Sequence, residues 1–256
     1  PLYVSDLRYS NPLSHAFIEA GRQAGFPIND DFNGPAQEGF GLYQVTQKNG
    51  ARCSAAVAYL DPVRERRNLT IVTGAQVNRI TFERGRANGV VYIAQGKAFH
   101  QVASREVLLC GGAINSPQLL MLSGIGPAMQ LRRHGVEVVF DAPQVGENLQ
   151  DHLDICTLRH STLPITYAPL SDARVAFDYY LRGHTGIGTS NIAEAGGFVR
   201  SRLAPDERPD IQLHFVPAML DDHGRHRLPG VGYTVHACFL RPRSPRRLSL
   251  ASGHAG

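Results

Sequence analysis

The alternation of apolar and polar residues in the first hundred positions predicts one helix followed by a series of short strands. Apolar side chains recur every three or four residues between Pro12 and Gly25, which indicates a helix that the glycine ends. Residues 26–52 are rich in Gly, Asn, Asp and Gln and are expected to form a long loop. After a short helix at 55–60, β-prone runs separated by turn residues are expected at 69–73, 77–82, 89–94 and 99–103.

The next segment has the pattern of a strand that is buried on both faces and leads into a helix. Residues 106–110 are almost wholly apolar, and Gly-Gly-Ala follows them directly. Ser116 and Pro117 are suited to begin a helix, which we expect at 117–122, with a further β segment at 136–140. This order of strand, glycine turn and helix indicates a portion that resembles a nucleotide-binding domain.

The second half of the chain has a different pattern, in which a helix is expected at 171–182. At 211–215 and 233–239 apolar residues alternate with polar ones, which predicts half-buried, antiparallel strands. His214 and His236 occupy polar positions of these strands, where a lone histidine is usually structural. We therefore expect an α/β portion over residues 1–155, and an α+β portion with an antiparallel sheet over residues 156–256.

Composition restricts the class of protein. Of the 256 residues, 43% are hydrophobic and 19% are charged, which excludes a disordered tail, a collagen and a coiled coil. No apolar run approaches the roughly 18 residues that a membrane-spanning helix needs. The four cysteines are separated and form no Cys-x-x-Cys pair, which indicates free thiols in a reducing compartment. We expect a cytoplasmic protein, either free or associated with the inner face of a membrane.

The positive charge of the chain lies at its C-terminal end. The formal net charge is +4, while residues 223–256 hold six arginines and no acidic residue, so the rest of the chain is slightly acidic. Because no basic stretch is interleaved with stacking aromatic residues, we expect no nucleic-acid partner. His223 and His226 are three positions apart but lack a third ligand, and no metal is expected.

The glycines that follow residue 110 are the strongest candidates for chemistry. Glycine lets the backbone approach a ligand closely, and the free N–H groups at the start of a helix attract a phosphate or a polar ring edge. As a pattern by itself, Gly-Gly-Ala is explained at least as well by a tight turn between strand and helix. The longer segment at 111–126 is far more specific.

That segment, GGAINSPQLLMLSGIG, is similar to the second signature of the glucose–methanol–choline (GMC) oxidoreductases, a family of flavoproteins that oxidise alcohols with FAD. Five other stretches resemble the same family in the same order: DDFNG at 30–34, EGF at 38–40, VGENLQDH at 145–152, EAGGF at 194–198 and PDIQLHF at 209–215. The resemblance covers about residues 2–249 and is closest to the branch of choline and alkanol dehydrogenases.

The resemblance implies roles for single residues in binding FAD. Val77 matches a family valine whose backbone contacts the adenine, a role that leaves its side chain in the core. Gly111, Gly112 and Ala113 match the turn that runs along the dinucleotide. Asn148 matches a stretch near the junction of the two family domains and is expected to contact the cofactor as well.

Glu194 is the candidate for contact with the substrate. It lies between two alanines and directly before Gly196-Gly197 in the second half of the chain. A carboxylate on the sheet of a substrate domain can bind a cationic head group or orient a substrate hydroxyl. The alternative, which the residues leave open, is a solvated or ion-paired acid at the end of a strand.

The resemblance implies FAD-dependent oxidation of a primary alcohol, choline-like or aliphatic, to an aldehyde, with an external electron acceptor. The family's N-terminal glycine fingerprint and C-terminal catalytic histidine have no match in this sequence. No catalytic residue is therefore assigned, and we expect a fold that is incomplete at both ends and inactive in isolation, with apolar surface through which it can form oligomers. The alternative is a catalytically silent remnant, or a module that binds a small molecule without flavin.

Overall fold

The computed structural model describes residues 1–167, 171–221 and 225–254, and the chain divides into two compact units. Unit 1 consists of Pro1–Leu69 and His152–Arg241, and unit 2 consists of Thr70–Asp151 and Pro242–Gly256. This division differs from the single boundary expected near residue 155, because the first 69 residues pack with the second half of the chain. Among the described residues, no helix has the length and apolar character needed to cross a membrane.

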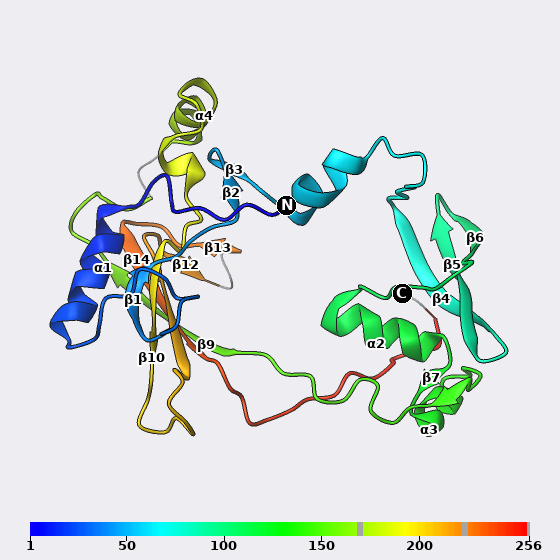
Figure 1. The fold of residues 1–256 in the computed structure, drawn as a ribbon. Helices are drawn as coiled ribbons and strands as arrows, with labels where there is room; N and C mark the ends of the chain where they lie inside the picture. Colours follow the sequence, from blue (N-terminus) through cyan, green and yellow to red (C-terminus); the bar gives the residue numbers. More distant parts are fainter. Residues whose placement is uncertain (168–170, 222–224, 255–256) are drawn as a thin grey trace. The chain divides into compact units, whose positions relative to one another are not determined.

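Unit 1 is built on a five-stranded antiparallel sheet (Figure 1). Its strand order is β1 (Gly39–Leu42), β10 (Ala195–Val199), β11 (Ile211–Val216), β14 (Gly232–Phe239) and β9 (Leu153–His160). The structure confirms the two antiparallel strands expected from alternation, which are β11 and β14. It corrects the expected loop at 26–52, since that segment supplies β1 at one edge of the sheet.

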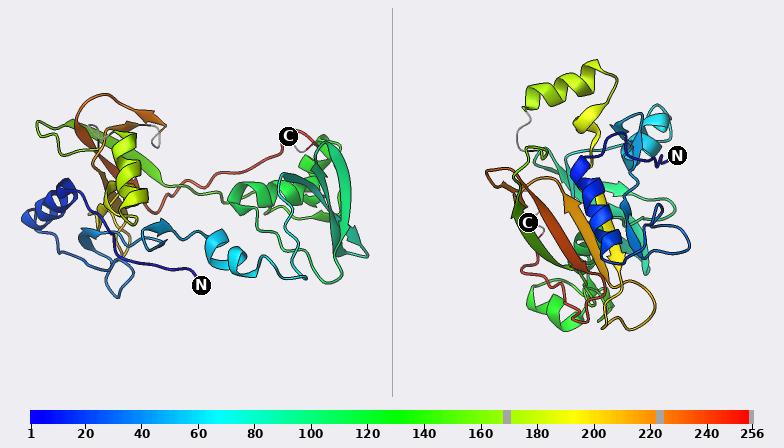
Figure 2. Two further views of the ribbon diagram at one scale, coloured as in Figure 1. Left: turned by 90° about the horizontal axis from the view of Figure 1, so that it is seen from above. Right: turned by 90° about the vertical axis from the view of Figure 1, so that its left-hand side faces the viewer.

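Helix α1 (Pro12–Gln23) covers one face of this sheet, as the right-hand view of Figure 2 shows. The helix confirms the prediction for this segment: Asn11 caps it, and Gly25 follows it with a φ of +91°. Phe17 stacks on Phe215 of β11 with 4.8 Å between ring centroids, and it also contacts Phe40 of β1. Burial of these aromatic rings holds the helix against the sheet.

The opposite face of the sheet carries polar side chains. In the strand register, Cys238 lies between Gln212 and Asp154, and His236 lies between His214 and Cys156. Side chains at paired positions of antiparallel strands point to the same face. We call this set of six residues on β9, β11 and β14 the polar face.

The remaining elements of unit 1 are short. Two small antiparallel pairs are formed by β2 (Gln47–Lys48) with β3 (Ala51–Arg52), and by β12 (Leu220–Asp221) with β13 (His226–Arg227). The short helix expected at 55–60 is a π-helix (Ala56–Leu60) followed by a 3₁₀-helix (Asp61–Val63). Helix α4 (Asp172–Leu181), capped by Ser171, confirms the prediction for 171–182 and contacts a 3₁₀-helix (Gly186–Thr189).

Unit 2 contains a three-stranded antiparallel meander of β4 (Ala75–Glu83), β5 (Arg86–Ala94) and β6 (Lys97–Val102). Both hairpins turn through two residues with positive φ, Arg84-Gly85 and Gln95-Gly96. This geometry matches the right-handed twist of the strands that it connects. The three strands expected at 77–82, 89–94 and 99–103 are confirmed, whereas 69–73 forms no strand.

Helix α2 (Gly112–Leu122) contacts β4 of the meander. A second helix, α3 (Ala128–Arg133), connects the parallel pair of β7 (Ile125–Gly126) and β8 (Phe140–Asp141). The segment expected as a strand at 136–140 contributes only the first residue of β8. A hydrophobic core of unit 2 is formed by side chains of these helices and of the C-terminal segment: Met121, Leu122, Leu131 and Leu250.

The prediction for the segment before α2 was wrong in two respects. Residues 106–110 form no strand with any part of the described chain, and Leu108 is 76% exposed. An apolar sequence alone does not make a strand, because the backbone also needs a partner for its hydrogen bonds. The helix begins at Gly112 instead of 117, with Pro117 inside it. Association through exposed apolar residues such as Leu108 stays a prediction.

Candidate functional site

The glycine turn of unit 2 presents an exposed stretch of backbone at the start of a helix. Gly111, Gly112 and Ala113 are all exposed, and Gly112 has a φ of +80°, a conformation that favours glycine. Apart from Gly112, its two neighbours and the nearby helix backbone, no atom lies within 4 Å of the place where a Cβ of Gly112 would be, so the backbone is open to a ligand on this side. Helix α2 has no side-chain cap at Gly111. The N–H groups of its first turn therefore remain available.

A pocket of about 380 Å³ adjoins this turn. It joins Val77 on β4 with Gly111, which is 34 positions later in the chain. The other walls are contributed by β5, by the apolar segment before the turn, and by α2. A volume of this size suits a ring system such as an adenine with part of its ribose, and free N–H groups at the helix start suit a phosphate or a polar ring edge.

The structure thus brings together Val77 and Gly111, two of the residues expected to bind the cofactor. Gly112 and Ala113, which were also expected to bind it, directly follow Gly111 in the first turn of α2. Asn148 is in the same unit but does not line this pocket. It is exposed, has a φ of +59°, and its Oδ1 accepts a hydrogen bond of 2.8 Å from Gln150. The position is suited to asparagine, which tolerates the left-handed region better than most residues do.

Glu194 has a different environment from either of the expected ones. Its side chain is fully buried, which contradicts the interpretation as a solvated acid at the end of a strand. Oε2 accepts hydrogen bonds from the backbone N–H of Asn11, at 2.6 Å, and from Ser14 Oγ, at 2.7 Å. Oε1 accepts from Ser190 Oγ, at 2.6 Å, and from the Tyr167 hydroxyl.

These four donors lie at the start of α1, directly after the 3₁₀-helix and in the loop before α4, so Glu194 connects three parts of unit 1 to β10. Burial, together with the Glu194 carboxylate, raises the pKa of Tyr167, which keeps its hydroxyl protonated as a donor. Because both carboxylate oxygens already accept from protein groups, a substrate would have to displace donors of this network. The geometry therefore supports a positioning role for Glu194.

The polar face of unit 1 is a second group of chemically capable side chains. Beside it, the Tyr43 hydroxyl donates to the carbonyl of Leu213, at 2.7 Å, and burial raises the pKa of Tyr43 to about 12. The Tyr43 ring lies 5.4 Å from the ring of His214. Burial, reinforced by neighbouring His236, lowers the pKa of His214, so this imidazole is neutral at pH 7.

At the other end of the polar face, the Asp154 carboxylate is hydrogen-bonded to His236 Nδ1 at 2.8 Å. Burial acts to raise the pKa of Asp154, but the hydrogen bonds from His236 and Cys238 outweigh it, and the pKa is lowered. Burial and the adjacent Asp154 raise the pKa of the Cys238 thiol to about 11.

Sequence reasoning identified His214 and His236 as positions on one side of a sheet, but it missed Asp154 and Cys156. Both belong to β9, which was not predicted, and the alternation of Leu153-Asp154-Ile155-Cys156 was the available signal. Four residues of alternation are too few to predict a strand. His223 lies outside the described residues, so the spacing of His223 and His226 is not interpreted further.

Comparison with known proteins relates this chain to flavoenzymes. The family model for GMC oxidoreductases (N-terminal part) matches residues 1–154. An alcohol dehydrogenase [acceptor] of Pseudomonas putida is 47% identical over 99% of this chain and 47% of its own length. The mitochondrial choline dehydrogenase of Mus musculus is 45% identical over 99% of this chain and 43% of its own length. The chain thus spans about half the length of these relatives.

Solved structures agree with the fold. Pyridoxine 4-oxidase from Mesorbium loti has a TM-score of 0.81 and 29% identity, and the match covers 100% of this chain and 47% of the oxidase. A variant of Aspergillus oryzae formate oxidase, studied for modification of its FAD, has a TM-score of 0.87 and 24% identity, with 99% and 50% covered. The expected combination of an α/β portion with an antiparallel α+β portion is confirmed.

Proposed function

Because this chain belongs to the GMC oxidoreductase family, we propose that it takes part in the FAD-dependent oxidation of a primary alcohol, choline-like or aliphatic, to an aldehyde, with electrons passed to an external acceptor. The single observation that carries the cofactor part is the pocket that joins Val77 to the exposed glycine turn of α2. Alcohol oxidation is proposed because the relatives of Pseudomonas putida and Mus musculus are named as alcohol and choline dehydrogenases.

The residues present in unit 2 fit part of FAD. The open backbone of Gly111, Gly112 and Ala113 would lie along the dinucleotide, and the N–H groups of the first turn of α2 would donate to a phosphate or to a polar ring edge. Val77 would contact the adenine through its backbone while its half-buried side chain forms a wall of the pocket. Asn148 would contribute its exposed side chain. When bound, the flavin supplies the acceptor for hydride from the alcohol.

For unit 1 we propose the substrate side of the reaction. Its polar face offers hydrogen-bonding groups on rigid strands, and Glu194 holds the helix that covers the other face. The neutral state of His214 at pH 7 makes this imidazole able to donate to or accept from a hydroxyl group. No group of this chain is assigned as the base that removes the alcohol proton.

Binding of FAD and of AMP to the chain, measured by isothermal titration calorimetry, tests the proposal. We compare Gly112→Ala with Gly96→Ala: both glycines have positive φ and open space at Cβ, but Gly96 lies in the turn between β5 and β6. We expect Gly112→Ala to weaken binding of both nucleotides at least about fivefold and Gly96→Ala to leave it unchanged. Absence of binding at millimolar concentration, or equal effects of the two substitutions, would overturn the cofactor proposal.

Activity separates an enzyme from a binding module. The chain loaded with FAD is assayed for aldehyde formation from choline and from a linear primary alcohol in the presence of an artificial electron acceptor. Turnover of either alcohol supports the proposed oxidation. Binding of FAD without turnover agrees with the expectation that the chain is inactive in isolation, whereas absence of both binding and turnover would favour the alternative of a silent remnant.

A further inference from the structure

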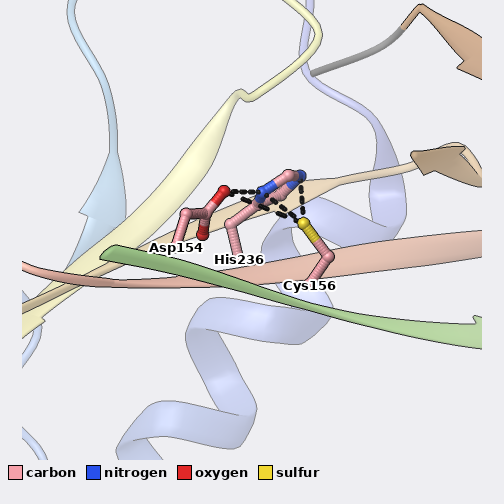
Figure 3. Close-up of side chains that lie close together, drawn as sticks. All are labelled: Asp154, Cys156 and His236. Carbon is pink, nitrogen blue, oxygen red and sulfur yellow. Dashed lines mark hydrogen bonds and ion pairs between the residues drawn. The ribbon is translucent and has the colours of Figure 1, made fainter. Parts of the chain in front are cut away.

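Three side chains with metal-binding atoms converge at the edge of the polar face. Asp154 and Cys156 extend from β9 and His236 from the adjacent strand β14, and their ligand atoms all lie within 4.8 Å of one another (Figure 3). Asp154 Oδ2 is 2.8 Å from His236 Nδ1, Cys156 Sγ is 3.1 Å from the same nitrogen, and Sγ is 3.7 Å from Oδ2.

This geometry differs from that of a nucleophilic triad. In a triad the acid contacts one imidazole nitrogen and the nucleophile contacts the other, so that the ring relays a proton between them. Here the carboxylate and the thiol both approach Nδ1, while Cys156 Sγ is farther, at 4.0 Å, from Nε2. The Cys156 thiol and His236 Nδ1 both lie within hydrogen-bond reach of the same carboxylate oxygen, Asp154 Oδ2, and the thiol donates to it. A cation placed between the three atoms would be bound by all of them at once.

The strand register holds these residues in place. Cys156 is paired directly with His236, and Asp154 with Cys238, in an antiparallel ladder that covers all eight residues of both strands. The His236 and Asp154 side chains are only 15% and 21% exposed. Ligands on rigid, half-buried strands lose little freedom when they bind an ion, which favours affinity.

The donor set selects the kind of ion. A thiolate and an imidazole are preferred by Zn²⁺ and similar transition metals, whereas Mg²⁺ and Ca²⁺ prefer oxygen ligands. Bonds of about 2.0–2.3 Å place the ligands of tetrahedral zinc roughly 3.3–3.8 Å apart, so small side-chain movements convert the observed separations into that geometry. Cys238 Sγ, 3.4 Å from the other oxygen of Asp154, is the nearest candidate for a fourth ligand.

We propose that Asp154, Cys156 and His236 form a binding site for Zn²⁺ or a similar divalent transition metal, with Cys238 or a water in the fourth position. The thiol of Cys156 releases its proton to solvent when it coordinates the ion. The site lies within unit 1, on the same polar face that we propose for the substrate side of the reaction.

Titration of the chain with Co²⁺ in a buffer without thiols tests this inference. Cobalt reports a sulfur ligand directly, because thiolate-to-metal charge transfer gives an intense near-ultraviolet absorption. We expect one equivalent of Co²⁺ to produce this absorption and one equivalent of Zn²⁺ to abolish it. In Cys156→Ser the absorption should fall by at least about half, and in His236→Gln and Asp154→Asn the affinity should fall more than about tenfold. Cys110→Ser, which removes an exposed thiol of unit 2, should leave the titration unchanged.

A second measurement avoids substitutions that disturb folding. In the unmodified chain, Zn²⁺ should slow the alkylation of Cys156 by iodoacetamide at least about tenfold, as read by mass spectrometry of its peptide, while exposed Cys110 in the same molecule reacts at an unchanged rate. Absence of the cobalt absorption, an undiminished absorption in folded Cys156→Ser, or equal protection of both cysteines would overturn the inference.

Discussion

The Glu194 carboxylate connects several segments of unit 1 through its hydrogen bonds. Glu194 is the residue before β10, yet its four donors lie at the start of α1, in the loop before α4 and in the segment after the 3₁₀-helix. A buried carboxylate is costly unless its oxygens are hydrogen-bonded, and here each oxygen accepts twice. The residue is therefore a structural anchor of the sheet and the helix that covers it.

We predict that Glu194→Gln lowers the free energy of unfolding by about 2–4 kcal/mol, because the amide group turns an NH₂ toward groups that are themselves donors. Urea denaturation followed by circular dichroism measures the effect. The matched control is Glu19→Gln on the exposed side of α1, where an exposed pair with Arg22 is lost and the change in stability should be far smaller. Equal stability of Glu194→Gln and the unmodified chain would contradict the anchoring role.

At the scale of elements, the connection between β10 and β11 is closed by a buried carboxylate. Asp210 is 1% exposed and accepts hydrogen bonds of 2.7 Å from both the backbone N–H and the hydroxyl of Ser201. Burial acts to raise the pKa of Asp210, but these hydrogen bonds outweigh it and the pKa is lowered. The carboxylate thus holds together the two ends of the eleven-residue connection formed by residues 200–210.

This shift predicts how the stability of the hairpin depends on pH. Because the folded pKa lies below the unfolded value of about 3.9, the contribution is complete above that value and is lost as the pH falls through the folded pKa. Asp210→Asn should therefore reduce the free energy of unfolding by about 1–3 kcal/mol at pH 7 and by less at pH 3. Urea denaturation at pH 7, 5 and 3 measures both values.

A control for this prediction is Asp172→Asn in the first turn of α4, an exposed position where we expect a change below about 0.5 kcal/mol. A loss of stability in Asp210→Asn that is as large at pH 3 as at pH 7 would show that the Asp210 carboxylate is not the group that titrates.

At the scale of the whole molecule, each unit has a core of its own. In unit 1 the aromatic rings of α1, β1 and β11 pack together, with Phe215 only 3% exposed. In unit 2 Leu131 is fully buried beside α2 and Leu250. Separate cores permit separate unfolding, and a chain with two cooperative units departs from two-state behaviour.

We therefore predict two transitions in differential scanning calorimetry. Leu131→Ala should lower the temperature of one transition and Phe215→Ala that of the other, each by several degrees, because deletion of a buried side chain costs about 2–5 kcal/mol. Each variant serves as the control for the other. A single transition that both substitutions lower would show that the two units unfold together.

Local features of the chain were predictable from its sequence. The helix over Pro12–Gln23, the hairpins with Arg84-Gly85 and Gln95-Gly96, and the alternating strands at 211–216 and 232–239 depend on contacts close in sequence and on turn geometry. The same holds for membership of the GMC family, since its motifs are continuous stretches of sequence. The glycines at 111 and 112 also predicted a backbone that a ligand can approach, and in the structure this backbone is exposed.

Only the tertiary structure decided which distant segments meet. The pairing of β1 with β10 brings residues 39–42 into the same sheet as the second half of the chain, and no local pattern specifies that pairing. Residues 106–110 show the converse: they are apolar enough for a buried strand, but no strand of the described chain pairs with them. The convergence of Asp154 and Cys156 on His236, some 80 positions later, and the burial of Glu194 follow from the same cause. Strand register and burial are set by contacts between segments that are far apart in sequence, and periodicity along one segment carries no information about its partner.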